Sequence, residues 1–421
     1  MKRNVLVACL PLAVVASSSS PLSALDWPEW RGPGRAGVWE DVKLPERLEP
    51  SSIERLWTAS IGGGYAGIAV VGERVLTLDR PKGSESERIV CLSSSDGRLL
   101  WKHEHPADYG KMEYDNGPRS TPTVRDGRVF TQGAMGHVHA LDLETGKVHW
   151  TLDVASVHGG KVPEWGHAPS PLRFDDLVLV QAGGAPGPTV LALEAAGGNG
   201  SGGRERWRAL SDEPGYSSAV LLDVAGKRQI GYWSAENAVG IEPGTGEVLW
   251  RVPFKSTYRV AIISPVLRDG LLLVSGFWEG SKVVRIAGPA EKEPPVVWSG
   301  KSLSCLMSTP LWRDGVLYAL DKDSGLLGVE WTTGKVLWSD GHKLTPKERN
   351  PQASMVWAGD RAVMLNARGE LILARLSKAG YEELGRVKVC GNTWSHPAFA
   401  GDRIYVRCET ELSCWRIKPS P

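Results

Sequence analysis

The sequence predicts an all-β fold, an eight-bladed β-propeller of four-stranded antiparallel blades, and three observations lead to it. A strand–turn–strand pattern that ends in tryptophan recurs along the chain, and its clearest copy is ALDLETGKVHW at residues 140–150. The copies are spaced 40 to 57 residues apart, close to the length of one blade. The 49 glycines and 28 prolines suit many short strands and turns. The tryptophans that end the copies are Trp57, Trp101, Trp150, Trp207, Trp250, Trp298 and Trp338.

Local chemistry explains the hairpin in each copy. In the clearest one, residues 140–143 are expected to form a strand and Glu144–Lys147 a tight turn. Gly146 suits a turn position that requires a positive φ, because glycine has no Cβ. A small or Ser/Thr-Pro stretch and an Asp-Gly or Gly-Asp turn precede the hairpin in most blades. We therefore expect blades to begin near Tyr65, Ser120, Ala168, Tyr216, Ile263, Ser308 and Gln352.

The two ends of the repeat region are each incomplete. Residues 395–415 supply three strands, one short of a blade, and Ile53–Trp57 resembles an outermost strand with no blade before it. Joining the two makes an eighth blade and removes two unpaired strand edges. The alternative is seven blades with the C-terminal piece as an appendage.

The first residues resemble a secretory signal. Lys2 and Arg3 precede the apolar run Val5–Ala16, and small residues follow. We predict a signal peptide at residues 1–24, an N-terminal strap at 25–52 and a single propeller domain at 53–418. The protein is thus expected to be periplasmic or secreted, with no transmembrane segment. Trp27 and Trp30 form either a binding patch or part of a strap across the propeller.

The net charge limits the classes of partner that the protein could bind. A formal charge of +1 lacks the basic surplus that nucleic acid binding needs, so no nucleic acid partner is expected, and we expect a monomer.

Five cysteines follow the predicted leader, an odd number that cannot pair completely. Cys408 and Cys414 either form a cross-strand disulfide or are small buried hydrophobic residues, as the other cysteines are expected to be.

The repeat with a Thr-Gly-Lys turn and terminal tryptophan resembles the pyrroloquinoline-quinone (PQQ) repeat family. Residues 140–150 match it best, followed by 240–250 and 328–338. The resemblance implies either a quinoprotein dehydrogenase or an exported propeller without enzymatic activity. The dehydrogenases hold PQQ with two adjacent cysteines, a tryptophan, an Asp base, and a Glu and an Asn on Ca²⁺. No two cysteines are adjacent here, and no Cys-x-x-Cys-His haem site is present. PQQ is a possible cofactor, but the sequence does not supply the full set of residues that binds it in the dehydrogenases. The cofactor therefore stays unknown.

Other chemistry is not indicated, and we predict no catalytic and no metal-binding residues. Asp321–Gly325 resembles half a calcium loop, but a hairpin turn explains it. His137 and His139 alternate along a strand and share a face, yet no third ligand is nearby in the sequence.

One set of residues remains, just before the expected innermost strand of each blade, where a propeller's central channel opens. Aromatic, cationic and amide groups at such a mouth would suit a small planar or anionic ligand. We predict a binding or interaction scaffold, with a PQQ-dependent oxidoreductase of atypical pocket as the alternative. The predicted mouth residues are Tyr65, Arg119, Trp165, His167, Tyr216, Arg259, Gln352, Trp394 and His396.

Overall fold

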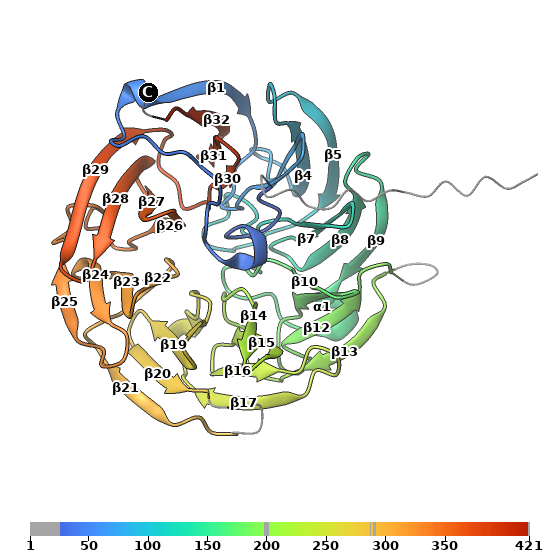
Figure 1. Cartoon of the computed structure of the whole chain (residues 1–421). Coiled ribbons are helices and arrows are strands. Elements are labelled where there is room, and N and C mark those ends of the chain that lie inside the picture. Colours follow the sequence, from blue (N-terminus) through green and yellow to red (C-terminus); the bar gives the residue numbers. More distant parts are fainter. Residues whose placement is uncertain (1–25, 198–201, 287, 289–291, 420–421) are drawn as a thin grey trace, which may run out of the picture.

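The computed structural model describes residues 26–197, 202–286, 288 and 292–419, so the predicted signal peptide lies outside the described residues. Eight four-stranded antiparallel sheets stand around a central axis and form a closed ring (Figure 1). The predicted eight-bladed propeller is confirmed. Each sheet begins with a short strand beside the channel and ends with a longer strand at the rim.

Seven blades follow one another along the chain, innermost strand first. Blades one and two hold β2 (Ala69–Val71), β3 (Arg74–Asp79), β4 (Ser86–Ser93), β5 (Leu99–Pro106), β6 (Thr123–Arg125), β7 (Arg128–Gln132), β8 (His137–Asp142) and β9 (Val148–Asp153). Blades three and four hold β10 (Leu172–Phe174), β11 (Leu177–Gln181), β12 (Val190–Glu194), β13 (Glu205–Ala209), β14 (Val220–Val224), β15 (Lys227–Trp233), β16 (Asn237–Ile241) and β17 (Val248–Pro253). Blades five to seven hold β18 (Val266–Arg268), β19 (Leu271–Gly276), β20 (Gly280–Arg285), β21 (Val296–Gly300), β22 (Leu311–Arg313), β23 (Val316–Asp321), β24 (Gly325–Glu330), β25 (Val336–Ser339), β26 (Ala353–Ala358), β27 (Arg361–Asn366), β28 (Glu370–Ser377) and β29 (Gly380–Lys388).

The eighth blade joins both ends of the repeat region, as predicted. The strands β30 (Ala398–Ala400), β31 (Arg403–Arg407) and β32 (Glu411–Ile417) come from the C-terminal end, and β1 (Ile53–Ser60) completes the sheet. β1 runs antiparallel to β32, from Ile53 opposite Ile417 to Ser60 opposite Glu411. This pairing closes the ring, so neither strand is left with an open edge towards its neighbour.

The terminal tryptophan of most blades contacts the following blade. The indole of Trp101 donates a hydrogen bond to Leu143 O at 3.0 Å and lies against Gly146, where a Cβ would be only 2.5 Å from the ring. Two constraints therefore favour glycine at position 146: the indole leaves no room for a Cβ, and the backbone has a φ of 70°. The same indole-to-carbonyl bond to the next blade recurs at Trp57, Trp150, Trp207, Trp298 and Trp338. Trp250 differs and bonds Gln229 of its own blade.

The segment before β1 enters the centre of the ring (Figure 1). Its short 3₁₀ turn η1 (Pro33–Arg35) presents Arg35 to the backbone of blades three and four, at Pro171 O (2.5 Å) and Ala219 O (2.6 Å). The guanidinium of Arg31 faces Met355 O at 3.3 Å on the other side of the channel. These buried cations tie opposite blades together through one chain segment.

The remaining helical elements are short: η2 (Pro50–Ser52), α1 (Val154–His158) and η3 (Thr257–Arg259). No helix in the described ranges has the length and apolar character needed to cross a bilayer. Asp321–Gly325 forms the turn between β23 and β24, the predicted hairpin. Cys408 and Cys414 are both free thiols in this structure.

Candidate functional site

A cavity of about 650 Å³ opens at the channel mouth. The segments that precede the innermost strands supply its wall, and Trp30 of the N-terminal segment joins them. In blade order, the wall includes Tyr65, Arg119, Trp165, Tyr216, Ile262, Met307, Gln352 and Trp394. Because each blade contributes side chains, the closed ring is a precondition for the site.

The wall is dominated by aromatic rings. Tyr65 stacks on Trp394 with 5.7 Å between ring centroids, and Tyr114 lies 5.7 Å from the same indole. Trp165 lies 5.4 Å from Tyr216, which continues the aromatic surface into blade four. Flat, rigid faces of this kind can stack against a planar group at little entropic cost. The aromatic lining residues are Trp30, Tyr65, Tyr114, Trp165, Tyr216, Tyr258, Phe277, Trp278 and Trp394.

Two tyrosines at the mouth have unusual backbones. Tyr114 has a φ of 55° and Tyr258 a φ of 53°, a region that costs a bulky L-residue about 1 kcal/mol or more. Both side chains are also exposed, Tyr114 at 41% and Tyr258 at 67%. Strain that holds an aromatic ring in solvent is more typical of a binding surface than of a packed core.

Cationic groups accompany the rings. Arg119 lies beside Tyr65, with the guanidinium carbon 5.6 Å from the ring centroid, and donates hydrogen bonds to Gly117 O and Tyr114 O, both at 2.6 Å. Burial lowers its pKa from the ordinary arginine value. Arg119 thus orders the loop that carries Tyr114 as well as adding positive charge. Arg349 is exposed at the edge of the cavity and forms no ion pair with any residue in the described ranges.

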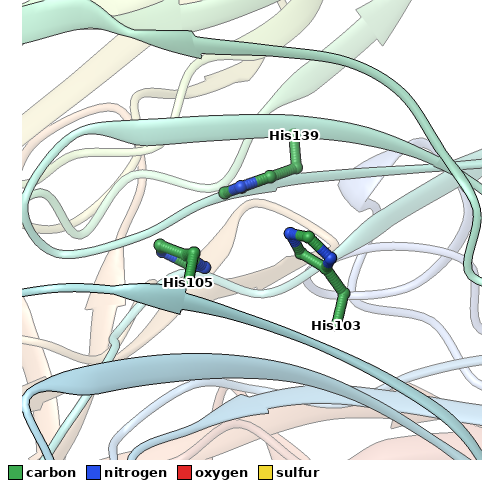
Figure 2. A group of neighbouring side chains, drawn as sticks. All are labelled: His103, His105 and His139. Atoms are coloured by element: carbon green, nitrogen blue, oxygen red, sulfur yellow. The ribbon is translucent and has the colours of Figure 1, made fainter.

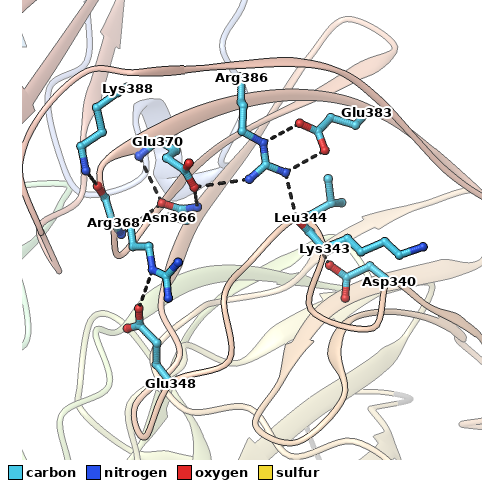
Figure 3. Close-up of polar contacts among 10 residues, drawn as sticks. All are labelled: Asp340, Lys343, Leu344, Glu348, Asn366, Arg368, Glu370, Glu383, Arg386 and Lys388. Atoms are coloured by element: carbon cyan, nitrogen blue, oxygen red, sulfur yellow. Dashed lines mark hydrogen bonds and ion pairs between the residues drawn. The ribbon is translucent and has the colours of Figure 1, made fainter.

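A polar network fixes the loop that carries Arg349, Asn350 and Gln352 (Figure 3). Arg386 of β29 forms two bonds to Glu383, at 2.6 and 2.7 Å, and donates to Lys343 O in the loop at 2.8 Å. Its guanidinium also reaches Glu370 at 3.3 Å. At the far end of the loop, Glu348 pairs with Arg368 at 3.4 Å.

The structure places seven of the nine predicted residues on the cavity wall, and two elsewhere. His167 is fully buried, where its Nδ1 lies 3.0 Å from Gln181 Oε1, and burial lowers its pKa to about 4. Arg259 is exposed on a left-handed backbone and pairs with Glu213 instead of lining the cavity.

The sequence prediction missed several wall residues, among them Tyr114, Tyr258, Trp278 and Arg349. These residues lie on connections and turns whose lengths differ between blades, so no repeat position marks them. A usable signal was the long connection 107–122, since long loops on a rigid scaffold often carry function. His137 and His139 lie away from the mouth, between blades one and two.

The donor set at the mouth does not fit a calcium–quinone centre. The described lining residues include no aspartate, glutamate or cysteine, so the wall offers neither a carboxylate base nor carboxylate ligands for Ca²⁺. His396 does face the cavity, but it also bonds Ser354 Oγ at 3.0 Å, and burial lowers its pKa to about 3. The lining combines aromatic rings with positive charge and suits recognition better than metal-assisted oxidation.

Comparison with known proteins agrees with the repeat pattern. The family model described as outer membrane protein assembly factor BamB matches residues 46–231 and 234–382, most of the chain. The chain belongs to this family. BamB of Yersinia pestis is 31% identical over 78 residues, which cover 18% of this chain and 20% of that protein. BamB of Burkholderia pseudomallei is 26% identical over 134 residues, covering 32% of this chain and 33% of that protein. The chain thus matches a fifth to a third of the length of these curated relatives.

Solved structures share the fold of this BamB-family chain. BamB from Moraxella catarrhalis superposes with a TM-score of 0.63 at 15% identity, covering 87% of this chain and 100% of that one. A europium-containing methanol dehydrogenase gives 0.68 at 12% identity, with 94% and 98% covered. At these identities the likeness shows the fold alone, and it does not separate a scaffold from a dehydrogenase.

Proposed function

We propose that this BamB-family chain is an exported binding scaffold and that the aromatic cavity at the channel mouth is its binding site. One observation carries the proposal. The described residues leave six large apolar side chains exposed, and three of them, Tyr114, Tyr258 and Trp278, surround this cavity. Exposed apolar side chains gathered beside a concave site are typical of recognition surfaces.

The lining indicates the chemistry of the ligand. Aromatic faces favour a planar group. Among the residues that the structure describes, Arg349 has no ion-pair partner and the lining holds no carboxylate, so Arg119 and Arg349 favour negative charge. A volume of about 650 Å³ suits a small molecule or a few side chains of a protein. We therefore expect a planar or anionic ligand, presented free or by a protein partner.

Family membership supports an interaction role. The relatives are named outer membrane protein assembly factors, and for this chain we propose a role that involves contact with other proteins. For this chain we propose a periplasmic or secreted location and a monomeric ring of residues 53–418 preceded by a strap. A PQQ-dependent oxidoreductase is the weaker candidate, because the described lining residues offer none of the carboxylates that such chemistry uses.

Calorimetry with matched planar probes tests the proposal. We expect naphthalene disulfonate, a planar dianion, to bind saturably and to raise the melting temperature, whereas proflavine, a planar cation, does neither. If both probes bind equally, or if neither probe binds, the proposed ligand chemistry is wrong. In parallel, PQQ with Ca²⁺ and alcohols should give no dye reduction, and saturable PQQ-dependent turnover would favour the oxidoreductase instead.

A further inference from the structure

Four histidines meet in the interface between blade one and blade two. His103 and His105 lie two residues apart on β5, so both point to the same side of the strand, and His137 and His139 do the same on β8. Figure 2 shows His103 and His105 pointing from one blade towards His139 of the other. The ring centroids of His105 and His139 are 4.4 Å apart, and those of His103 and His139 are 5.0 Å apart.

The spacing of three of these rings suits a metal ion. One nitrogen from each of His103, His105 and His139 lies within 4.8 Å of the other two. Nitrogens bound tetrahedrally to Zn²⁺ at about 2.0–2.1 Å lie roughly 3.4 Å from one another, so small ring rotations would complete the geometry. His137 is close by, 5.0 Å from His105 between ring centroids.

The buried nitrogens of this cluster are not satisfied by the protein. Neither ring nitrogen of His105 makes a hydrogen bond to any residue in the described part of the chain, and the same holds for Nδ1 of His139 and of His137. The side chains of His105 and His139 are 8% and 3% exposed. A buried polar atom without a partner costs about 1–3 kcal/mol, which a bound cation would offset.

Glu87 of β4 adds the support that metal-bound histidines usually have. Its Oε2 lies 3.5 Å from His105 Nε2, while Oε1 accepts hydrogen bonds from Tyr109 Oη at 2.5 Å and from Ala134 N at 2.9 Å. At that distance the carboxylate makes no hydrogen bond to His105 in the structure, but it lies beside one imidazole nitrogen and leaves the other for a metal. Glu87 is therefore placed to orient His105 when the ring rotates towards a bound ion.

The cluster is reachable from solvent. His103 is half-buried on the outermost strand of its blade, so it stands where an ion would enter.

We propose that His103, His105 and His139 form a binding site for a divalent transition-metal ion, Zn²⁺ in particular, that links blade one to blade two. Imidazole ligands suit zinc, copper and nickel, and three nitrogen ligands without a carboxylate oxygen among them disfavour calcium and magnesium. The site is independent of the cavity at the channel mouth, since none of these histidines lines it.

The test uses the full, untagged chain, freed of metal with a chelator and dialysed against Zn²⁺. We expect one zinc per chain by mass spectrometry, and Cu²⁺ loaded in its place should show nitrogen hyperfine splitting in its electron paramagnetic resonance spectrum. His103→Gln should weaken Zn²⁺ binding about tenfold or more. The matched control is His149→Gln, which removes an exposed histidine from the adjacent β9.

Two results of the zinc measurements would overturn the proposal. One is a wild-type chain that retains no more zinc than the His103→Gln variant, and the other is an equal loss of binding in His149→Gln. The spectrum of the copper-loaded wild type needs no variant, so it decides the question even if a substituted chain folds poorly. A copper signal without imidazole nitrogen would also contradict the site.

Discussion

The outer turns of the blades and the channel mouth are built on the same repeat but differ in how they use it. At the outer turns one contact recurs: a terminal indole covers the turn glycine of the next blade and bonds a nearby carbonyl. At the mouth, the corresponding positions hold a tyrosine, an arginine, a tryptophan, an isoleucine, a methionine or a glutamine, depending on the blade. Repetition at the rim builds the ring, whereas variation at the mouth creates a surface with its own chemistry.

The two regions also differ in how their aromatic residues are buried. Trp150 is 3% exposed and hydrogen-bonded, whereas Tyr258 is 67% exposed on a strained backbone. The first arrangement stabilises the fold, and the second contributes little to folding. A substitution at the outer turns should therefore lower stability, whereas a substitution at the mouth should weaken ligand binding and leave stability nearly unchanged.

The largest effect is expected at the rim. Trp150→Ala removes a buried indole and its hydrogen bond to blade three, which should lower the free energy of unfolding by about 3–5 kcal/mol. Urea denaturation followed by circular dichroism measures it. A loss below about 1 kcal/mol would mean that the repeated contact does not hold the blades together.

A smaller, pH-dependent effect is expected at His167, which lies outside the cavity wall. Its pKa is lowered to about 4 in the fold, whereas the unfolded value is about 6.5. The unfolded chain thus binds the proton first as the pH falls, so this contribution is complete above pH 6.5 and is lost towards pH 4. Between pH 7 and pH 5 it amounts to about 2 kcal/mol. Melting curves of His167→Gln should show a correspondingly weaker pH dependence, and those of His149→Gln a much smaller change, because His149 is largely exposed.

A smaller effect on stability is expected in the network that holds the mouth loop. Arg386→Gln removes partly exposed ion pairs, so the free energy of unfolding should fall by less than about 1 kcal/mol. Hydrogen exchange in residues 341–352 should nevertheless accelerate, because the bond to Lys343 O is lost. Arg375→Gln is the control, since Arg375 pairs with Glu382 in the same blade without bonding the loop. Equal exchange in both variants would show that the network does not order the loop.

The sequence predicted the ring because its signals are local. The turn glycine and terminal tryptophan lie within one hairpin, and the strand at Ile53–Trp57 could be matched to the incomplete C-terminal blade by counting strands. The same positional logic located seven wall residues, since the start of an innermost strand always faces the channel.

What the sequence did not predict depends on contacts between blades or on loop geometry. His103 and His105 belong to one blade and His139 to the next, so no single repeat displays the cluster. Tyr258 and Arg259 occupy a left-handed turn that sends one side chain to the cavity and the other to Glu213. Such backbone conformations are set by tertiary packing, so they leave no periodic pattern in the sequence.

The most direct test of the account is a double measurement on one variant, Tyr258→Ala with Trp278→Ala. The free energy of unfolding should stay within about 0.5 kcal/mol of the wild type, because both side chains are exposed. Affinity for naphthalene disulfonate should fall about tenfold or more, while Val157→Ala, exposed on α1, leaves it unchanged. A variant that binds as well as the wild type, or that binds weakly only because it has unfolded, would contradict the claim that the mouth is the binding surface.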